Sequence, residues 1–167
     1  AKLFGQATGC PIAMINDAAA AGVAEMHFGA GRGFMGKTLL LTLGTGIGSA
    51  LLNDGVLVPN TELGHLQVRG RDAEHLAASA VREREGLSWE EWAARLSEVI
   101  GVVDSLFWPD LVLLGGGVSR KADKFIPNLT CHTPVVAASL RNAAGIVGGA
   151  LAVHRHRDKH GTDGQSH

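Results

Sequence analysis

The chain has 167 residues, and its 15 basic and 16 acidic side chains give a formal charge of −1. With 46% apolar and 19% charged residues, the composition is typical of one globular domain and excludes a disordered chain. Because acidic and basic residues are nearly equal in number, the chain lacks the overall positive charge that would indicate binding to nucleic acid or to a membrane surface.

The first part of the chain predicts a strand, a helix and a glycine-rich loop. Pro11–Ile15 is short and apolar, which favours a buried strand. Asp17 then stands where a helix N-cap is expected, before an alanine-rich helix over Ala18–Phe28. Gly29–Gly36 follows as a loop.

A β-hairpin is the next predicted unit. Two apolar strands, Thr38–Leu43 and Ile47–Leu52, are separated by Gly44-Thr45-Gly46. Asn53-Asp54-Gly55 is a strong turn signal and leads to a return strand over Val56–Val58. We expect a loop over Thr61–His65 and a short strand over Leu66–Val68.

Helices dominate the following segment. Arg71–Glu85 is charged and rich in alanine, which predicts an exposed helix. Ser88 and Glu91 form a capping box that opens a long helix over Trp89–Phe107, and Pro109 ends it.

The last part alternates strands and helices. Leu111–Leu114 is wholly apolar, as in a parallel strand buried on both faces. The remaining expected elements are a helix over Val118–Phe125, a strand over Val135–Ala138, a helix over Ala143–Val153 and a disordered tail over 154–167. This order predicts an α/β fold with some antiparallel pairing.

Two glycine-rich turns are candidate phosphate sites. Gly44, Thr45 and Gly46 join two strands rather than a strand and a helix, which argues against a dinucleotide-binding fold. Glycines at such a turn still let a phosphate approach and bind the backbone amides. Gly115, Gly116 and Gly117 follow a buried strand and admit the same ligand. A plain tight turn is the alternative at both places.

Polar residues beside these turns are candidate sugar ligands. Asp17, at the end of a predicted strand with Asn16 before it, could act as a general base on a sugar hydroxyl or simply cap the helix. Glu62 and His65 could hold sugar hydroxyls, and His65 could instead bind a metal, although solvated loop residues are the common alternative.

Neither a membrane segment nor a secretory signal is predicted. The longest apolar run, 143–153, is much shorter than the roughly twenty residues of a membrane-spanning helix. Cys10 and Cys131 lie too far apart in sequence for a disulfide framework or a zinc motif. We therefore expect a reduced protein in the cytoplasm.

Taken in order, these motifs resemble the ROK sugar kinases (repressor, open reading frame, kinase), and within them the bacterial polyphosphate glucokinases. The stretches that carry the resemblance are Ile15-Asn16-Asp17-Ala18, Gly29–Gly33, Leu41–Ala50, Pro59–His65 and Leu114–Ser119. The resemblance implies an actin-like, ribonuclease H-like ATPase fold. It also implies phosphoryl transfer to the 6-hydroxyl of glucose, with inorganic polyphosphate or ATP as donor and Mg²⁺ bound to the donor phosphates.

The resemblance assigns a role to each candidate residue. Asp17 would be the catalytic base, and Asn16, Glu62 and His65 would hold the sugar. Gly44-Thr45-Gly46 would be the second phosphate loop, and Gly115–Gly117 would lie on the nucleotide side. A homodimer is implied as well, with the helix over Trp89–Phe107 as a candidate surface.

Two departures from the family pattern matter. The cysteines that hold zinc in most ROK proteins are absent from 66–85, so no zinc site and no metal ligand is predicted in this chain. The Asp-x-Gly-Gly-Thr phosphate loop is absent too, so we expect a C-terminal portion whose N-terminal lobe, with the Mg²⁺ ligand, is largely missing. The implied division is 1–28 for the end of the N-terminal lobe, 29–153 for the C-terminal lobe and 154–167 for the tail.

Three other functions remain open from the sequence. One is a strictly ATP-dependent ROK glucokinase, which the triple glycine at Gly115–Gly117 permits. Another is a non-catalytic remnant that binds sugar or dimerises, since the chain alone is expected to have little or no kinase activity. A sugar-sensing repressor is the third, although the chain has no helix-turn-helix motif.

Overall fold

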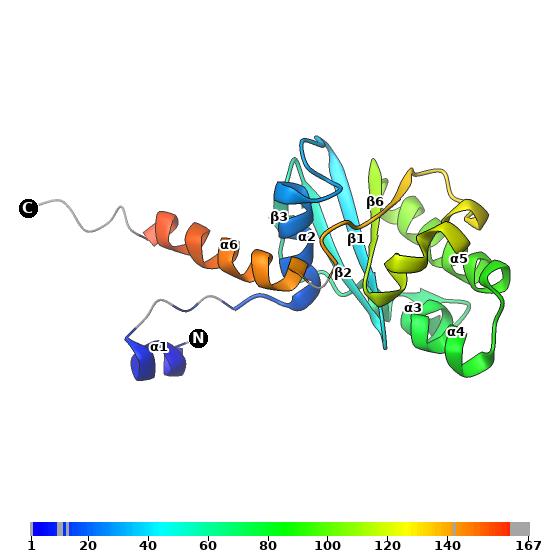
Figure 1. Cartoon of the computed structure of the whole chain (residues 1–167), viewed down its shortest axis with the longest axis horizontal. Helices are drawn as coiled ribbons and strands as arrows, with labels where there is room; N and C mark the ends of the chain where they lie inside the picture. Colours follow the sequence, from blue (N-terminus) through cyan, green and yellow to red (C-terminus); the bar gives the residue numbers. More distant parts are fainter. Residues whose placement is uncertain (1, 10–11, 13, 142, 161–167) are drawn as a thin grey trace, which may run out of the picture.

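A five-stranded mixed sheet with helices on both faces forms the centre of the molecule (Figure 1). The computed structural model describes residues 2–9, 12, 14–141 and 143–160, with Lys2 and 153–160 described by their backbone alone. The strands follow the order β3-β2-β1-β6-β7. Their bounds are Lys37–Leu43 for β1, Ile47–Asn53 for β2, Val56–Val58 for β3, Leu111–Gly115 for β6 and Val135–Ala137 for β7.

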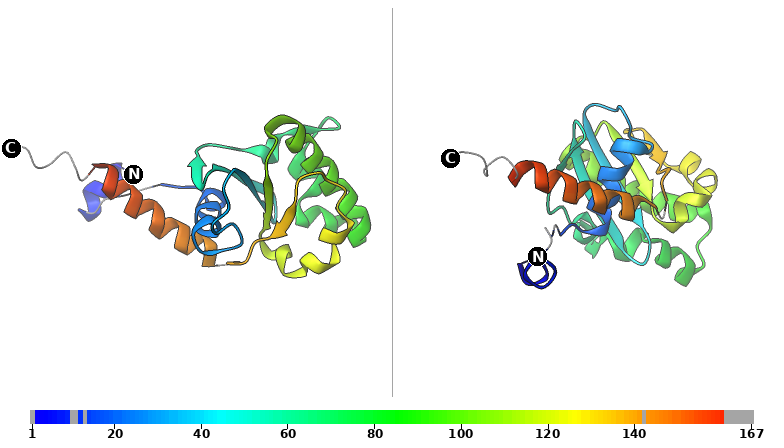
Figure 2. Two further views of the ribbon diagram at one scale, coloured as in Figure 1. Left: turned by 90° about the horizontal axis from the view of Figure 1, so that it is seen from above. Right: turned by 60° about the vertical axis from the view of Figure 1, so that its left-hand side comes forward.

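The helices form the two outer layers (Figure 2). On one face lie α2 (Asp17–Phe28) and α6 (Ala143–His160), and on the other lie α3 (Ala73–Ala77), α4 (Ser79–Glu85) and α5 (Trp89–Phe107). The shorter elements are α1 (Lys2–Thr8), the 3₁₀ helices η1 (Leu63–His65), η2 (Gly117–Lys124) and η3 (Ile126–Asn128), and a ribbon of β4 (Gln67–Val68) and β5 (Arg71–Asp72). No helix among the described residues is both long enough and apolar enough to cross a bilayer.

Strand β1 is buried on both faces, which accounts for its run of leucines. Leu39, Leu41 and Leu43 pack into the cluster with α3, α4 and α5, whereas Leu40 packs into the cluster with α2. This alternation follows from the two-residue period of a strand. β1 pairs antiparallel with β2 and parallel with β6, and β2 pairs antiparallel with β3 across the Asp54-Gly55 turn. The predicted hairpin and the predicted parallel strand are therefore both confirmed.

The start of the chain differs from its prediction. No strand is assigned to Ile12, Met14 or Ile15, Met14 is 79% exposed, and residues 11 and 13 lie outside the described part. The buried strand over Pro11–Ile15 is therefore wrong at its described positions, because none of the described strands pairs with this segment. The N-cap of α2 is also not Asp17 but Asn16, whose side chain accepts a 2.6 Å hydrogen bond from the Ala19 amide.

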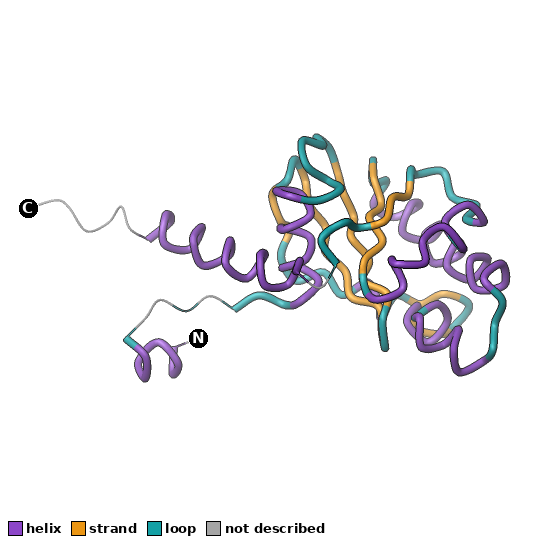
Figure 3. The backbone as a smooth tube through the Cα atoms, in the orientation of Figure 1, coloured by secondary structure: helices purple, strands orange, loops and turns teal. Residues whose placement is uncertain are grey.

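Three later segments differ as well (Figure 3). Arg71–Glu85 is not one exposed helix: β5 and the helices α3 and α4 share it, Ala78 breaks the two helices, and one face is buried. The segment after Gly116 is a 3₁₀ helix with non-helical backbone at Lys121. The backbone of α6 is helical to His160, where a tail was expected from residue 154, because a formed helix extends at little cost. Residues 161–167 lie outside the described part.

Gly148 allows α6 to cross α2 at close range. A Cβ atom at this position would overlap the carbonyl oxygen of Ala20 in α2. We expect Gly148→Ala to lower the free energy of unfolding by about 1–3 kcal/mol, because the two backbones would have to separate. Thermal unfolding followed by circular dichroism measures the change in Tm.

Gly149→Ala is the matched control, since an added Cβ there meets no atom within 4 Å. Alanine is favoured over glycine inside a helix by up to about 1 kcal/mol, so this variant is expected to be at least as stable as the native chain. Equal Tm values for the two variants would contradict the close crossing.

Candidate sugar and phosphate site

The two glycine turns lie side by side because β1 and β6 are parallel neighbours. Thr42 of β1 is in register with Gly115 of β6, so both strands end at the same edge of the sheet. Gly116 has a φ of 88°, and a Cβ atom there would overlap the backbone of Leu43. Glycine is therefore required at this contact, and it lets the two turns approach each other.

A pocket of about 180 Å³ opens between these turns and the helical layer. Its lining residues are Leu43, Gly44, Ser79, Arg82, Glu83, Trp89, Gly117, Val118 and Lys121. The guanidinium of Arg82 lies 3.6 Å from the centre of the Trp89 ring, and the Lys121 ammonium lies 5.8 Å from it. The sequence did not single out either cation among its scattered basic residues, because their convergence depends on the packing of α4 and η2.

The start of α2 brings Asn16 and Asp17 to the same edge of the sheet. The side-chain amide of Asn16 donates to Glu62 Oε1 at 3.4 Å, which joins two of the predicted sugar ligands. Asp17 occupies the first turn of α2 and is exposed, and its Oδ1 accepts a 2.8 Å bond from the Ala18 amide. A Cβ atom at Gly48 would lie 3.0 Å from that of Ala18, so α2 begins next to the Gly44–Gly48 turn.

Ser49 holds the loop that carries Glu62. Its hydroxyl donates to the carbonyl of Thr61 at 2.9 Å and accepts from the amide of Leu63, also at 2.9 Å. Ser49 is buried in β2, so the loop position is tied to the sheet. Ser49 stands inside the motif Leu41–Ala50, but nothing in the sequence indicated that it braces a loop more than ten residues away.

His65 ends η1 and faces two carboxylates. Its Nδ1 lies 3.3 Å from Asp72 Oδ2 and 3.9 Å from Glu74 Oε1. The hydrogen bond to His65 is the main cause that lowers the pKa of Asp72 below its ordinary value, and a hydrogen bond from Gln67 adds to it. The three ligand atoms lie within 4.8 Å of one another, a spacing that would also admit a metal ion.

Two glycines, Gly46 and Gly64, let the segment with the predicted sugar ligands pack closely against the turn with the predicted phosphate site. A Cβ at Gly64 would overlap Ile47 O, and one at Gly46 would overlap Glu74 Oε2. Both glycines therefore allow η1 and α3 to pack directly against the Gly44–Gly48 turn. The predicted sugar ligands and phosphate turns thus gather along one edge of the sheet.

Comparison with known proteins matches residues 1–80 to the ROK family. The chain is 51% identical to the polyphosphate glucokinase of Mycobacterium tuberculosis over 91% of its own length. It is 31% identical to a glucokinase of Thermotoga maritima, across 87% of this chain and 67% of that relative. The chain belongs to the ROK family.

A solved structure has the same fold as this ROK chain. The inorganic polyphosphate/ATP-glucomannokinase of Arthrobacter sp. strain KM superposes with a TM-score of 0.86 and 51% identity, over 93% of this chain and 61% of that one. The α/β fold with a mixed sheet is thus the actin-like fold of ROK sugar kinases, as predicted. The chain spans about half the length of its mycobacterial relatives, 56% in Mycobacterium tuberculosis and 44% in Mycobacterium leprae.

Proposed function

We propose that this chain carries the sugar site and part of the donor site of a glucokinase that uses inorganic polyphosphate, ATP or both. The observation that carries the proposal is the arrangement at one sheet edge: Asn16 bonded to Glu62, Asp17 beside them, and two glycine turns next to a pocket with two cations. The names of the relatives from Mycobacterium tuberculosis and Arthrobacter support the reaction type and both donors.

In this proposal, Asp17 accepts the proton of the sugar hydroxyl as the hydroxyl oxygen attacks the terminal phosphorus of the donor. The bond from that phosphorus to the rest of the donor breaks, and the shortened polyphosphate or ADP leaves. Asn16, Glu62 and His65 hold the other hydroxyls, which fixes the reacting oxygen in place. The amides of Gly44–Gly46 and Gly115–Gly117 receive the donor phosphates, and Arg82 and Lys121 offset their charge.

Mg²⁺ would neutralise charge on the donor phosphates when bound. The main protein ligand for the ion is still expected in the N-terminal lobe.

The kinase proposal is tested with a chimaera in which this chain replaces the segment that it matches in the Mycobacterium tuberculosis relative. We expect glucose 6-phosphate to form with polyphosphate, ATP or both. A folded chimaera that binds glucose but transfers phosphate from neither donor would contradict the proposal and favour the non-catalytic remnant. Transfer from ATP alone would favour the strictly ATP-dependent alternative.

The donor pocket is tested on the chain itself. Arg82→Gln or Lys121→Gln is expected to weaken polyphosphate binding about tenfold or more, because each removes a charged hydrogen bond to phosphate. Isothermal titration calorimetry at two salt concentrations measures the affinity. Arg84→Gln is the control, because Arg84 lies in the same helix but pairs with Glu85 at the surface; an equal loss in this variant would contradict a localised site.

Two other features of the proposal rest on the resemblance, and a third, the cytoplasmic location, rests on the cysteine usage. The division at residues 28 and 153, the cytoplasmic location and the homodimer stay predictions. Leu106 and Trp108, both exposed at the end of α5, support a contact at this helix.

A further inference from the structure

The turn between β4 and β5 brings Asp72 next to His65. Arg69 and Gly70 have φ values of 53° and 71°, which is the backbone of a two-residue turn with both residues left-handed. The register of the ribbon pairs Gln67 with Asp72. Asp72 is thereby placed next to the residue that ends η1, although it is seven positions away in sequence.

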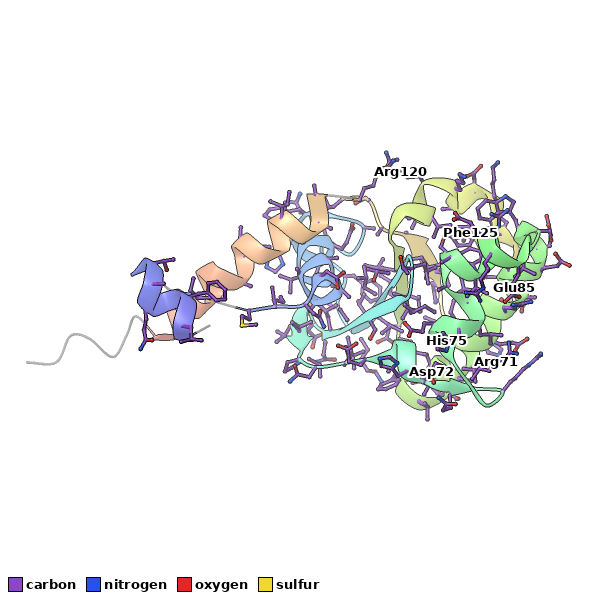
Figure 4. All side chains as sticks on the ribbon, turned by 90° about the horizontal axis from the view of Figure 1, so that it is seen from below. Arg71, Asp72, His75, Glu85, Arg120 and Phe125 are labelled. Carbon is purple, nitrogen blue, oxygen red and sulfur yellow. The ribbon has the colours of Figure 1, made fainter. Side chains whose placement is uncertain are left out.

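The contacts of Asp72 leave each of its oxygens with a donor. Oδ2 lies 3.3 Å from His65 Nδ1, and Oδ1 accepts from the side-chain amide of Gln67. Glu74 Oε1 lies 3.9 Å from the same Nδ1, and the charge of His75 also acts on Asp72. Figure 4 shows Asp72 and His75 close together at the start of α3. The hydrogen bonds from His65 and Gln67 and the charge of His75 favour an ionised Asp72, in agreement with its lowered pKa.

We propose that Asp72 is a positioning residue that fixes the tautomer of His65, with the proton on Nδ1 and a lone pair on Nε2 for a sugar hydroxyl. An ionised carboxylate can only accept hydrogen bonds, so the ring must donate from Nδ1. The neutral ring then keeps Nε2 as an acceptor. This inference deepens the proposed function and rests on it for the role of His65 as a sugar ligand.

With this tautomer, His65 accepts a hydrogen bond from a sugar hydroxyl and does not donate one. Glu62 is also an acceptor when ionised, and the backbone amide of His65 lies 3.4 Å from the carbonyl oxygen of Glu62. Both side chains therefore take hydrogen bonds from hydroxyl groups that donate. Glucose analogues in which fluorine replaces the contacted hydroxyl are expected to bind poorly, because fluorine leaves the two acceptors unpaired.

The tautomer is measured directly on the ¹⁵N-labelled chain, with EDTA present so that no metal ion occupies the cluster. Long-range ¹H–¹⁵N spectra at neutral pH, with His65 assigned from the His65→Gln variant, are expected to show protonated Nδ1. Asp72→Asn is expected to switch the proton to Nε2, because the new amide donates to Nδ1. Asp72→Glu restores a carboxylate and is expected to keep the native tautomer.

The affinity for glucose is measured by titrating glucose into the labelled chain and following the same spectra. Asp72→Asn is expected to weaken glucose binding about 10–100-fold, the range found when a metal-ligating histidine loses the partner that orients its ring. Glu90→Gln, an exposed carboxylate at the start of α5, is the charge-matched control and should leave both readouts unchanged.

The outcomes separate the inference from the proposed function. If His65→Gln weakens binding while Asp72→Asn changes neither tautomer nor affinity, the positioning role is overturned and the sugar site stands. If His65→Gln leaves glucose affinity unchanged, the proposed sugar role of His65 fails, and with it the use of Nε2 that we propose.

Discussion

Asparagine in place of Asp17 is expected to lower kcat for glucose phosphorylation by about 10²–10⁴-fold in the chimaera. The amide has nearly the shape of the carboxylate and can still accept the bond from the Ala18 amide, but it cannot take the proton of the sugar hydroxyl. Asn16 remains the cap of α2, so the fold should be unaffected. KM for glucose should change little, because the substitution removes a proton acceptor and leaves Asn16, Glu62 and His65 in place.

Steady-state kinetics with varied glucose, with circular dichroism as a check on folding, measures both parameters. Asp123→Asn, at an exposed position in η2, is the control and should keep native kinetics. A loss of less than threefold for Asp17→Asn would show that another group takes the proton. Because the capping role belongs to Asn16, a large loss could not be attributed to a damaged helix start.

Alanine at Glu25 is expected to lower the free energy of unfolding by about 2–4 kcal/mol, because several buried donors would lose their acceptor. Glu25 is fully buried in α2. Its Oε1 accepts from the amide of Leu140 at 2.7 Å, and Oε2 accepts from the amides of Ala30 and Ser139 and from the hydroxyl of Ser139. Without the carboxylate these donors, which join α2 to the segment before α6, lose their partner.

Urea denaturation of the chain measures this loss. Glu25→Gln keeps one acceptor oxygen and is expected to fall between the native chain and Glu25→Ala. Glu90→Ala removes an exposed carboxylate and is the control. If Glu25→Ala and Glu90→Ala unfold at the same urea concentration, the buried network contributes nothing to stability.

The sequence correctly predicted features that depend on residues close together in the chain. Ser88 and Glu91 are three residues apart, and the structure forms the capping box with both hydrogen bonds present. The hairpin of β2 and β3 and the fully apolar β6 were likewise expected from patterns within a few residues. The structure joins Asn16 and Glu62 by a hydrogen bond, while the roles that the resemblance implied for them stay predictions.

Features that depend on distant packing were not predicted. Glu25 resembles any charged residue on an amphipathic helix, and its burial depends on residues more than a hundred positions away. Arg82 and Lys121 become neighbours only through Trp89. The break at Ala78 has no glycine or proline to mark it, because it is set by the burial of Ala77 and Val81 against α5.

Trp89 lines the proposed donor pocket, so the fluorescence of its indole can report on that pocket. The ring is held between Arg82, 3.6 Å from its centre, and Phe125, whose ring is stacked on it at 6.0 Å. Of the other two indoles, Trp92 is fully buried and Trp108 is 77% exposed, so a quencher dissolved in water reaches Trp108 first. Emission that survives quenching therefore comes from Trp89 and Trp92, and of these two only Trp89 lines the pocket. An anion that draws Arg82 off the Trp89 ring would alter that emission without any added label.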